Sequence, residues 1–237
     1  MKKIVFLTAT SVLLLASYAH AQVRSLEERV SRLENQQLSR QEIPDSIFAF
    51  DGFVPLEHLD VRARIEREFY LMLADKATLV MWQKRAAIFF PYIERTLSDL
   101  KMPDSLKYVV LIESGLQLNA YSYAGASGPW QFMKRTGHAY NLRQIGRDID
   151  YRRDFIKSTN AAILHLKDLY EKFHDWNLVL AAYNCGAGCV SSALRTQNVS
   201  SFWSLVLPQE TERYVPRRGV VGGRNDATRP ADELGLR

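Results

Sequence analysis

Apolar residues recur at helical spacing through most of the chain from Asp60 onward, and few stretches alternate between apolar and polar positions. Residues 78–90 carry one such stripe, and residues 92–97 continue it after Pro91. A stripe repeated every three or four residues is typical of a helix that buries one face, whereas alternation is typical of a half-buried strand. The pattern therefore predicts a mainly α-helical fold, in which Asp60 caps the first long helix and Pro91 starts or kinks a later one.

One predicted helix, residues 106–113, places an acidic residue on its apolar face. Three apolar side chains at helical spacing share that face with Glu113, and Gly115 should end the helix just beyond it. A carboxyl group at the negative end of a helix dipole, partly out of water, should have a raised pKa. Such a group can act as a general acid near neutral pH. The alternative is a surface glutamate that happens to match the stripe.

The first 21 residues resemble a secretory signal peptide. Lys2 and Lys3 form a short basic region, residues 4–16 form an apolar stretch, and small residues at 19 and 21 provide a cleavage site after Ala21. A retained membrane anchor is the alternative, but the apolar run is short for a bilayer span of about 20 residues. We therefore expect export to the periplasm.

Residues 22–47 are predicted to form a polar helical leader and linker. Within residues 22–41 the apolar positions follow heptad-like spacing over about two heptads, fewer than a firm coiled coil needs. The segment is either a helix for weak self-association or a solvated helix.

The net charge of +5 does not indicate nucleic-acid binding. Lys2 and Lys3 belong to the predicted signal peptide, and residues 217–237 hold five arginines against three acidic residues, so the part between them is close to neutral. A nucleic-acid-binding surface would need clustered positive charge. Residues 217–237 are glycine-rich and lack aromatic residues, which predicts a disordered tail.

The two cysteines, Cys185 and Cys189, lie four residues apart. In an exported protein they could form a disulfide, but two half-buried free thiols fit the sequence equally well. No suitably spaced histidine pair accompanies them, so the sequence predicts no metal site and no cofactor.

Four short motifs occur in one order and spacing. They are Glu113-Ser114-Gly115, residues 120–126 (AYSYAGA), residues 128–133 (GPWQFM) and residues 181–186 (AAYNCG). Together they resemble the soluble lytic transglycosylase family, and residues 150–153, 158–159 and 207–215 add a similarity to its membrane-bound D-type branch. The resemblance extends from about residue 53 to residue 216.

The resemblance implies a lysozyme-like helical domain with an N-terminal helical extension, acting on peptidoglycan strands. We assign residues 48–102 to a helical N-terminal subdomain and residues 103–216 to the transglycosylase domain. The family cuts the β-1,4 bond between N-acetylmuramic acid and N-acetylglucosamine without net hydrolysis and leaves 1,6-anhydromuramoyl ends. One glutamate acts as acid and then as base, and here it corresponds to Glu113.

The resemblance also implies a set of substrate-binding residues around the acid. They are Ser122, Gln131, Met133, Tyr183, Asn184 and Tyr214. Ser122 corresponds to a serine that contacts the N-acetyl group, and Tyr183 and Tyr214 correspond to tyrosines near the acid.

Simpler roles remain open for several of these residues. Ser122 could cap a turn, Tyr183 and Met133 could fill the core, and Asn184 could cap a helix.

One departure from the family pattern is Ala187, which stands where the family often has a glutamate. Residues 114–131 contain no acidic side chain, so a second carboxylate is missing from the natural place beside Glu113. Asp148, Asp150 and Asp154 could supply one, although the neighbouring arginines favour ion pairs. A lysozyme-type hydrolase and a non-catalytic peptidoglycan-binding scaffold are therefore the alternative functions.

Overall fold

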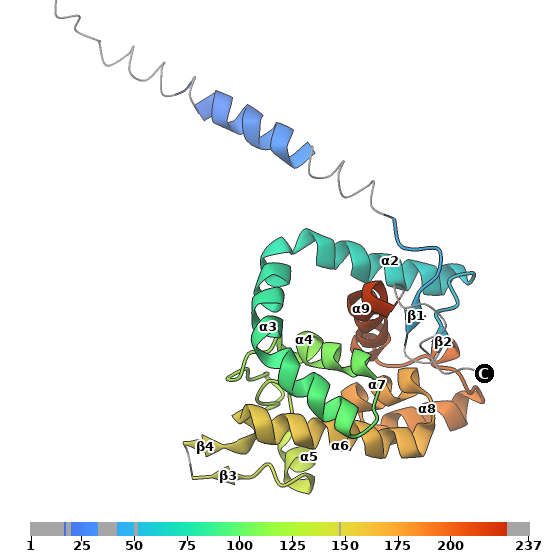
Figure 1. Ribbon diagram of the computed structural model, residues 1–237. Helices are drawn as coiled ribbons and strands as arrows, with labels where there is room; N and C mark the ends of the chain where they lie inside the picture. Colours follow the sequence, from blue (N-terminus) through green and yellow to red (C-terminus); the bar gives the residue numbers. More distant parts are fainter. Residues whose placement is uncertain (1–16, 18–19, 33–41, 50–51, 147, 227–237) are drawn as a thin grey trace, which may run out of the picture. The chain divides into compact units, whose positions relative to one another are not determined.

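The computed structural model describes residues 17, 20–32, 42–49, 52–146 and 148–226, and the chain divides into two compact units, Met1–Ile43 and Pro44–Arg237 (Figure 1). In the first unit residues 20–32 form an exposed helix. Most of the predicted signal peptide and residues 33–41 of the leader lie outside the described residues. Within the described ranges, no helix has both the length and the apolar character needed to cross a membrane.

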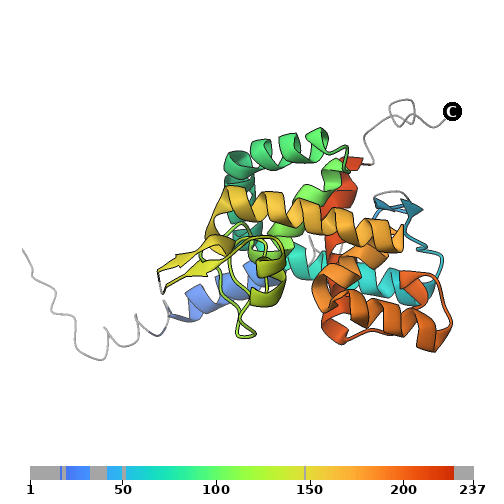
Figure 2. The same ribbon diagram turned by 90° about the horizontal axis from the view of Figure 1, so that it is seen from below.

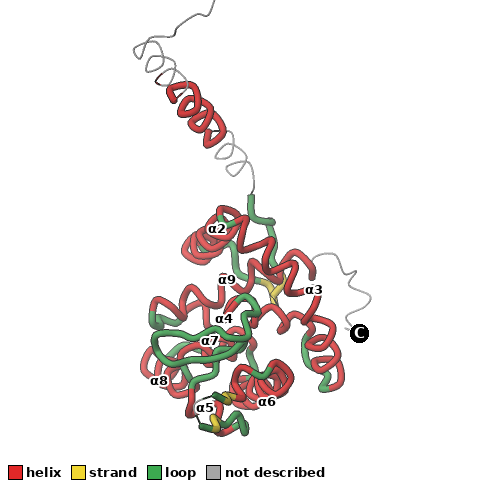
Figure 3. The backbone as a smooth tube through the Cα atoms, turned by 90° about the vertical axis from the view of Figure 1, so that its left-hand side faces the viewer, coloured by secondary structure: helices red, strands yellow, loops and turns green. Residues whose placement is uncertain are grey.

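The second unit is built mainly from helices, as the hydrophobic pattern predicts, and its strands are two residues long (Figure 3). Strands β1 (Phe48–Ala49) and β2 (Gly52–Phe53) pair antiparallel, as do β3 (Gln144–Ile145) and β4 (Ile149–Asp150). The main helices are α2 (Leu59–Ala74), α3 (Lys76–Asp99), α4 (Val109–Ser114), α5 (Lys134–Ala139), α6 (Phe155–Phe173), α7 (Trp176–Cys185), α8 (Ala187–Gln197) and α9 (Gln209–Asp226). Short 3₁₀ turns cover Asp104–Tyr108, Tyr151–Arg153 and Phe202–Ser204.

Helix α3 runs through Pro91 without a break. Asp75 caps its start by accepting a hydrogen bond from the Thr78 amide at 3.0 Å. A proline inside a helix removes one backbone hydrogen bond. Here Ile93 and Leu97, just beyond it, are at most 1% exposed, so packing against the core keeps both halves in one helix.

Helix α7 lies at the centre of the core. Its residues 178–182 are almost fully buried, and it packs against α6, α8 and α9 (Figures 1 and 2). Trp130 is also fully buried, and its indole nitrogen donates to the Thr159 hydroxyl of α6 at 2.9 Å. The loop that precedes α5 is thus anchored to the same core.

That loop depends on two glycines with positive φ. Gly115, at φ 59°, ends α4, and a Cβ there would lie 2.6 Å from the indole nitrogen of Trp82 on α3. Gly128, at φ 83°, lies against the backbone of Arg152, where a Cβ would come within 1.7 Å of the carbonyl oxygen. Neither position leaves room for a side chain, so α3 and the Arg152 segment can approach the loop closely.

The Arg152 side chain supports this loop from inside. It is 5% exposed, donates to the carbonyls of Gly125 and Phe132 at 2.9 and 3.0 Å, and pairs with Asp150 at 2.7 Å. Burial alone would raise the pKa of Asp150, but the hydrogen bonds and charge of Arg152 hold it below its usual value. The predicted ion pair between Asp150 and its arginine neighbour is confirmed.

The prediction that a disordered tail begins at residue 217 is wrong for residues 217–226. They continue α9, which packs against α2, α4, α7 and β1 (Figure 1). Arg218 and Gly219 are buried, and Arg217 bonds to Glu68 of α2 at 3.0 Å. Composition alone did not predict this helix, because it is stabilised by contacts with distant residues and not by a high apolar content of its own. Residues 227–237 lie outside the described residues.

Candidate active site

A cleft of about 770 Å³ opens into the second unit, and all seven site residues expected from the sequence line it. They come from separate parts of the chain: the end of α4, the loop before α5, the end of α7 and the start of α9. They are Glu113, Ser122, Gln131, Met133, Tyr183, Asn184 and Tyr214. The structure therefore brings the expected residues together around one concave surface.

Glu113 lies near the C-terminal end of α4, one residue before the final Ser114, with its side chain half-buried at the cleft. The hydroxyl of Tyr214, on α9, donates a hydrogen bond of 2.5 Å to its Oε1. Among the described residues Tyr214 is its one hydrogen-bond partner. A carboxyl group with a single neutral donor and no cation has little to stabilise its charge.

The pKa of Glu113 is accordingly raised to about 7. Burial is the largest cause, and the nearby charge of Glu210 also raises it, while the hydrogen bond from Tyr214 opposes the shift. The direction agrees with the expectation from the apolar helix face. Glu113 can therefore hold a proton near neutral pH and release it to a reacting group.

Two tyrosines, the half-buried Tyr183 and the buried Tyr214, lie beside this carboxyl group. Tyr183 donates from its hydroxyl to the Trp130 carbonyl at 2.9 Å, while Tyr214 donates to Glu113. Burial and the neighbouring Glu113 charge raise the pKa of both phenols well above 10. Both remain protonated hydroxyls, so they act as fixed donors rather than acids.

Ser122, Gln131 and Met133, from the loop before α5, line the cleft, and the first two also form hydrogen bonds within the loop. The Ser122 hydroxyl accepts from the Ala126 amide at 3.0 Å, so it caps a turn and also lines the cleft. Gln131, at φ 48°, donates from its side chain to the Gly128 carbonyl at 2.7 Å. Met133 is 45% exposed, so it lines the cleft rather than filling the core.

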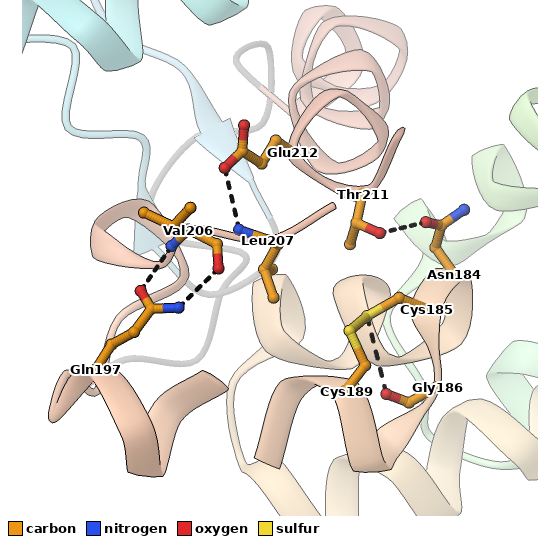
Figure 4. The surroundings of a disulfide bond; sticks show 9 residues. All are labelled: Asn184, Cys185, Gly186, Cys189, Gln197, Val206, Leu207, Thr211 and Glu212. Carbon is orange, nitrogen blue, oxygen red and sulfur yellow. Dashed lines mark hydrogen bonds between the residues drawn. A yellow bond between two sulfur atoms is a disulfide. The ribbon is translucent and has the colours of Figure 1, made fainter. Parts of the chain in front are cut away.

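Asn184 connects α7 to α9. Its side-chain oxygen accepts a hydrogen bond from the Thr211 hydroxyl at 2.7 Å (Figure 4). The residue that caps α7 is Gly186, so Asn184 is not the helix cap that the sequence left open. This bond holds the start of α9, and with it Tyr214, close to the end of α7.

The two cysteines are joined. Cys185 and Cys189 form a disulfide across the junction of α7 and α8, with their Cα atoms 5.9 Å apart (Figure 4). Cys185, Gly186 and Ala187 all line the cleft. The crosslink therefore fixes one edge of the cleft, at the position where the family pattern often has a glutamate instead of Ala187.

Several cleft residues were not predicted. Glu210, Arg213 and Arg217 line the cleft from α9 on the same face as Tyr214. Together with Tyr214 they are spaced three, one and three residues apart, which is the spacing of one helix face. A helix continued beyond residue 216 would have predicted Arg217 on that face.

His165 of α6 was also missed. It packs its ring 5.4 Å from that of Tyr183 and lies 3.0 Å from the Tyr140 hydroxyl, which donates to Asp168 at 2.6 Å. Burial lowers the pKa of His165, against the charge of Asp168.

Comparison with known proteins fits this geometry. Residues 91–206 match the family model described as "Transglycosylase SLT domain". This segment is a transglycosylase SLT domain. The chain is 38% identical over 180 residues to "Membrane-bound lytic murein transglycosylase D" of Escherichia coli (strain K12), covering 73% of this chain and 40% of that protein. It is also 35% identical over 120 residues to "Putative tributyltin chloride resistance protein" of Alteromonas sp. (strain M-1), covering 49% of this chain and 58% of that protein.

The chain thus spans about two fifths of the length of transglycosylase D. Among solved structures it is similar to the 70 kDa soluble lytic transglycosylase SLT70 from Escherichia coli, with 21% identity and a TM-score of 0.47, over 74% of this chain and 32% of that one. The lytic transglycosylase Slt from Pseudomonas aeruginosa gives 17% identity and a TM-score of 0.46, over 73% and 30%.

The SLT domain as matched includes Glu113 and the loop and α7 residues of the cleft, but not α9. Tyr214, which contacts Glu113 directly, lies eight residues beyond its end. Asp148, Asp150 and Asp154 fall inside the matched segment but do not line the cleft. Asp154 instead caps α6, accepting from the Lys157 amide at 2.9 Å.

Within the described ranges, no group of three or more His, Cys, Asp or Glu side chains could hold a metal ion.

Proposed function

We propose that this protein is a lytic transglycosylase that cleaves the β-1,4 bond between N-acetylmuramic acid and N-acetylglucosamine in peptidoglycan. The observation that carries the proposal is a carboxyl group with a pKa of about 7 inside an open cleft. The SLT domain and the 38% identity to a lytic murein transglycosylase support the same activity.

In the first step Glu113 acts as the general acid. Its proton passes to the glycosidic oxygen, the bond from that oxygen to C1 of the muramic acid breaks, and N-acetylglucosamine leaves with a free hydroxyl. Positive charge develops on C1 and its ring oxygen, and Glu113 is now an anion nearby. Tyr214 donates to Oε1 throughout, which orients the carboxyl group and stabilises its charged form.

In the second step the Glu113 carboxylate acts as the base. It takes the proton from the C6 hydroxyl of the same sugar, and that oxygen bonds to C1 to close the 1,6-anhydro ring. Glu113 ends protonated, so the cycle is complete and no water is consumed. A nucleophile within the substrate gains from proximity, which can lower a barrier by roughly 7–11 kcal/mol in ideal cases.

The remaining cleft residues are proposed to bind the glycan. Hydroxyl and amide groups with flat apolar surfaces suit sugars, and Ser122, Gln131 and Asn184 supply the polar groups. Met133 and Tyr183, which line the same cleft, supply apolar surface. Since the resemblance implies action on the cell wall, we also propose export to the periplasm through residues 1–21.

A lysozyme-type hydrolase is the second candidate, and Glu210 is the observation that favours it. Glu210 is an exposed carboxylate that lines the same cleft as Glu113. A hydrolase needs a second carboxylate to activate water or to attack C1. The two mechanisms leave different ends on the glycan, so product analysis separates them.

The test is digestion of purified peptidoglycan sacculi followed by mass spectrometry of the soluble products. A transglycosylase releases anhydro ends, which are lighter by one water than the reducing ends left by a hydrolase. Glu113→Gln should lower the rate by roughly 10²–10⁴-fold, the usual range for loss of a general acid or base. Glu171→Gln, an exposed residue of α6 outside the cleft, is the matched control.

Two outcomes would contradict the proposal. Products that all carry reducing ends would favour the hydrolase. Sacculi that bind the wild-type protein without releasing soluble fragments would favour a binding scaffold.

A further inference from the structure

Glu68 of α2 is 1% exposed and holds two arginines of α9. Its Oε1 accepts from Nε of Arg213 at 2.7 Å, and its Oε2 accepts from Nε of Arg217 at 3.0 Å. Each bond uses one carboxylate oxygen and one guanidinium nitrogen. Both oxygens of the carboxylate therefore accept from an arginine, and the two guanidinium groups are held by one shared partner.

Both arginines also line the cleft. Their side chains are 33% and 35% exposed, whereas that of Glu68 is 2% exposed. In the described part of the chain, neither arginine has a hydrogen bond or ion pair other than the one to Glu68. Their terminal nitrogens are thus free to donate to a ligand in the cleft.

The charges around Arg213 and Arg217 favour the binding of an anion. Two positive guanidinium groups share one buried negative partner. Glu113 holds a proton up to about pH 7. Glu210 is the other acidic residue on the cleft, and no ion pair joins it to either arginine within the described ranges. Guanidinium groups bind carboxylates through paired N–H donors, which gives both strength and a defined geometry.

We propose that Arg213 and Arg217 form a carboxylate-binding subsite of the cleft that takes the peptide stem carried by muramic acid. This proposal rests on the proposed function, because that substrate brings carboxylates into the cleft. Arg213 is adjacent in sequence to Tyr214, the partner of Glu113, so one helix, α9, supplies both the subsite and the hydrogen-bond donor of the acid, and all of these residues line the cleft. The peptide would then help to position the sugar whose bond is cut.

Muramic acid offers a carboxylate from two sources. One is the peptide stem, and the other is the lactyl group that is exposed when the peptide is removed. Three substrates separate them: glycan with its peptides, peptide-free glycan with free lactyl carboxylates, and peptide-free glycan whose lactyl carboxylates have been converted to amides.

The test compares Arg213→Gln and Arg217→Gln with the wild type on all three substrates. Each variant keeps one arginine on Glu68. The control is Arg64→Gln. Arg64 lies on α2, donates a hydrogen bond to the Trp203 carbonyl at 3.0 Å and does not line the cleft. We expect KM for the peptide-bearing glycan to rise about 10-fold with little change in kcat, since a charge-assisted contact is lost. The amidated glycan should show no change.

A rise on the peptide-bearing glycan alone would assign the subsite to the stem. A rise on the peptide-free glycan with free lactyl carboxylates alone would assign it to the lactyl group, and an equal rise on both would mean that it takes either carboxylate; each of these two results would overturn the assignment to the stem. An equal effect on all three substrates, or no effect, would overturn the proposal and leave the arginines as a helix contact only.

Binding of a muramoyl peptide to the Glu113→Gln variant, with and without Arg217→Gln, separates this proposal from the catalytic one. Calorimetric binding weakened about 10-fold by Arg217→Gln would support the subsite even if no glycan were cleaved. Unchanged binding would reject it even if the enzyme were active.

Discussion

Glu113 and Glu68 are both helix carboxyl groups held away from bulk water, yet their surroundings give them opposite tasks. Glu113 meets one neutral hydroxyl, that of Tyr214, and its pKa is raised to about 7. Glu68 meets two guanidinium groups, those of Arg213 and Arg217. The first can exchange a proton, and the second holds α9 against α2.

The comparison shows that burial alone does not determine what a carboxyl group does. Removing it from water penalises its charge in both places. At Glu68 two cations compensate that penalty, while at Glu113 only a hydroxyl dipole does so. The same helix, α9, supplies the partners of both residues, so a single element supports the chemistry and the packing.

The largest expected effect is on folding stability, from Glu68→Gln. Removing one partner of a buried ion pair typically costs about 3–5 kcal/mol, and we expect the lower end because both arginines keep access to water. Chemical denaturation measures the free energy of unfolding. Glu66→Gln, on the same helix in an exposed pair with Arg62 at 3.7 Å, should cost less than about 1 kcal/mol. Similar losses for both variants would contradict the assigned role.

A smaller effect is expected for Tyr214→Phe, this time on activity. The hydrogen bond to a charged group contributes about 1.5–3 kcal/mol, so kcat should fall roughly 10–100-fold. Since this bond lowers the pKa of Glu113, its loss should raise that pKa further. The pH at which kcat/KM declines, near 7 in the wild type, should then move upward. A decline that moved to lower pH would reject the hydrogen bond as a stabiliser of the Glu113 anion.

The smallest effect concerns how stability changes with pH. The folded-state pKa of Glu113 is above the unfolded value, so the stability that its neutral form provides is present at pH 4 and is lost as pH rises through about 7. The free energy of unfolding of Glu113→Gln, relative to that of the wild type, should therefore rise by on the order of 1–2 kcal/mol between pH 4.5 and 8. This is less than the full pKa shift implies, because the group opens into the cleft. A difference between the two proteins that stayed constant with pH would show that Glu113 has an ordinary pKa.

The position of Glu113 near the end of its helix could be predicted from the sequence. The apolar stripe before Glu113 and the glycine after it are local, so the helix and its end follow from neighbouring residues. The expected binding residues lie in short motifs with recognisable spacing, and all of them line the cleft.

The contacts of Glu68 with α9 could not be predicted in the same way. Its bonds join residues 145 and 149 positions apart, and no local pattern shows which distant residues a carboxylate will contact. The glycine and arginine content of residues 217–226 indicated disorder, because composition does not record the α2 surface against which this segment packs. Without that helix, Arg217 had no expected neighbour.

The Cys185–Cys189 disulfide has a practical consequence for measuring the cleft. It closes a ring of only a few residues, so it restricts the unfolded chain little, by about 2 kcal/mol in the entropy model. These are the two cysteines of the chain, and both are partly accessible, with Cys185 on the cleft wall. Mild reduction followed by a thiol-reactive fluorophore would therefore place a reporter on the wall of the cleft without any engineered mutation, and substrate entry could be followed by its emission.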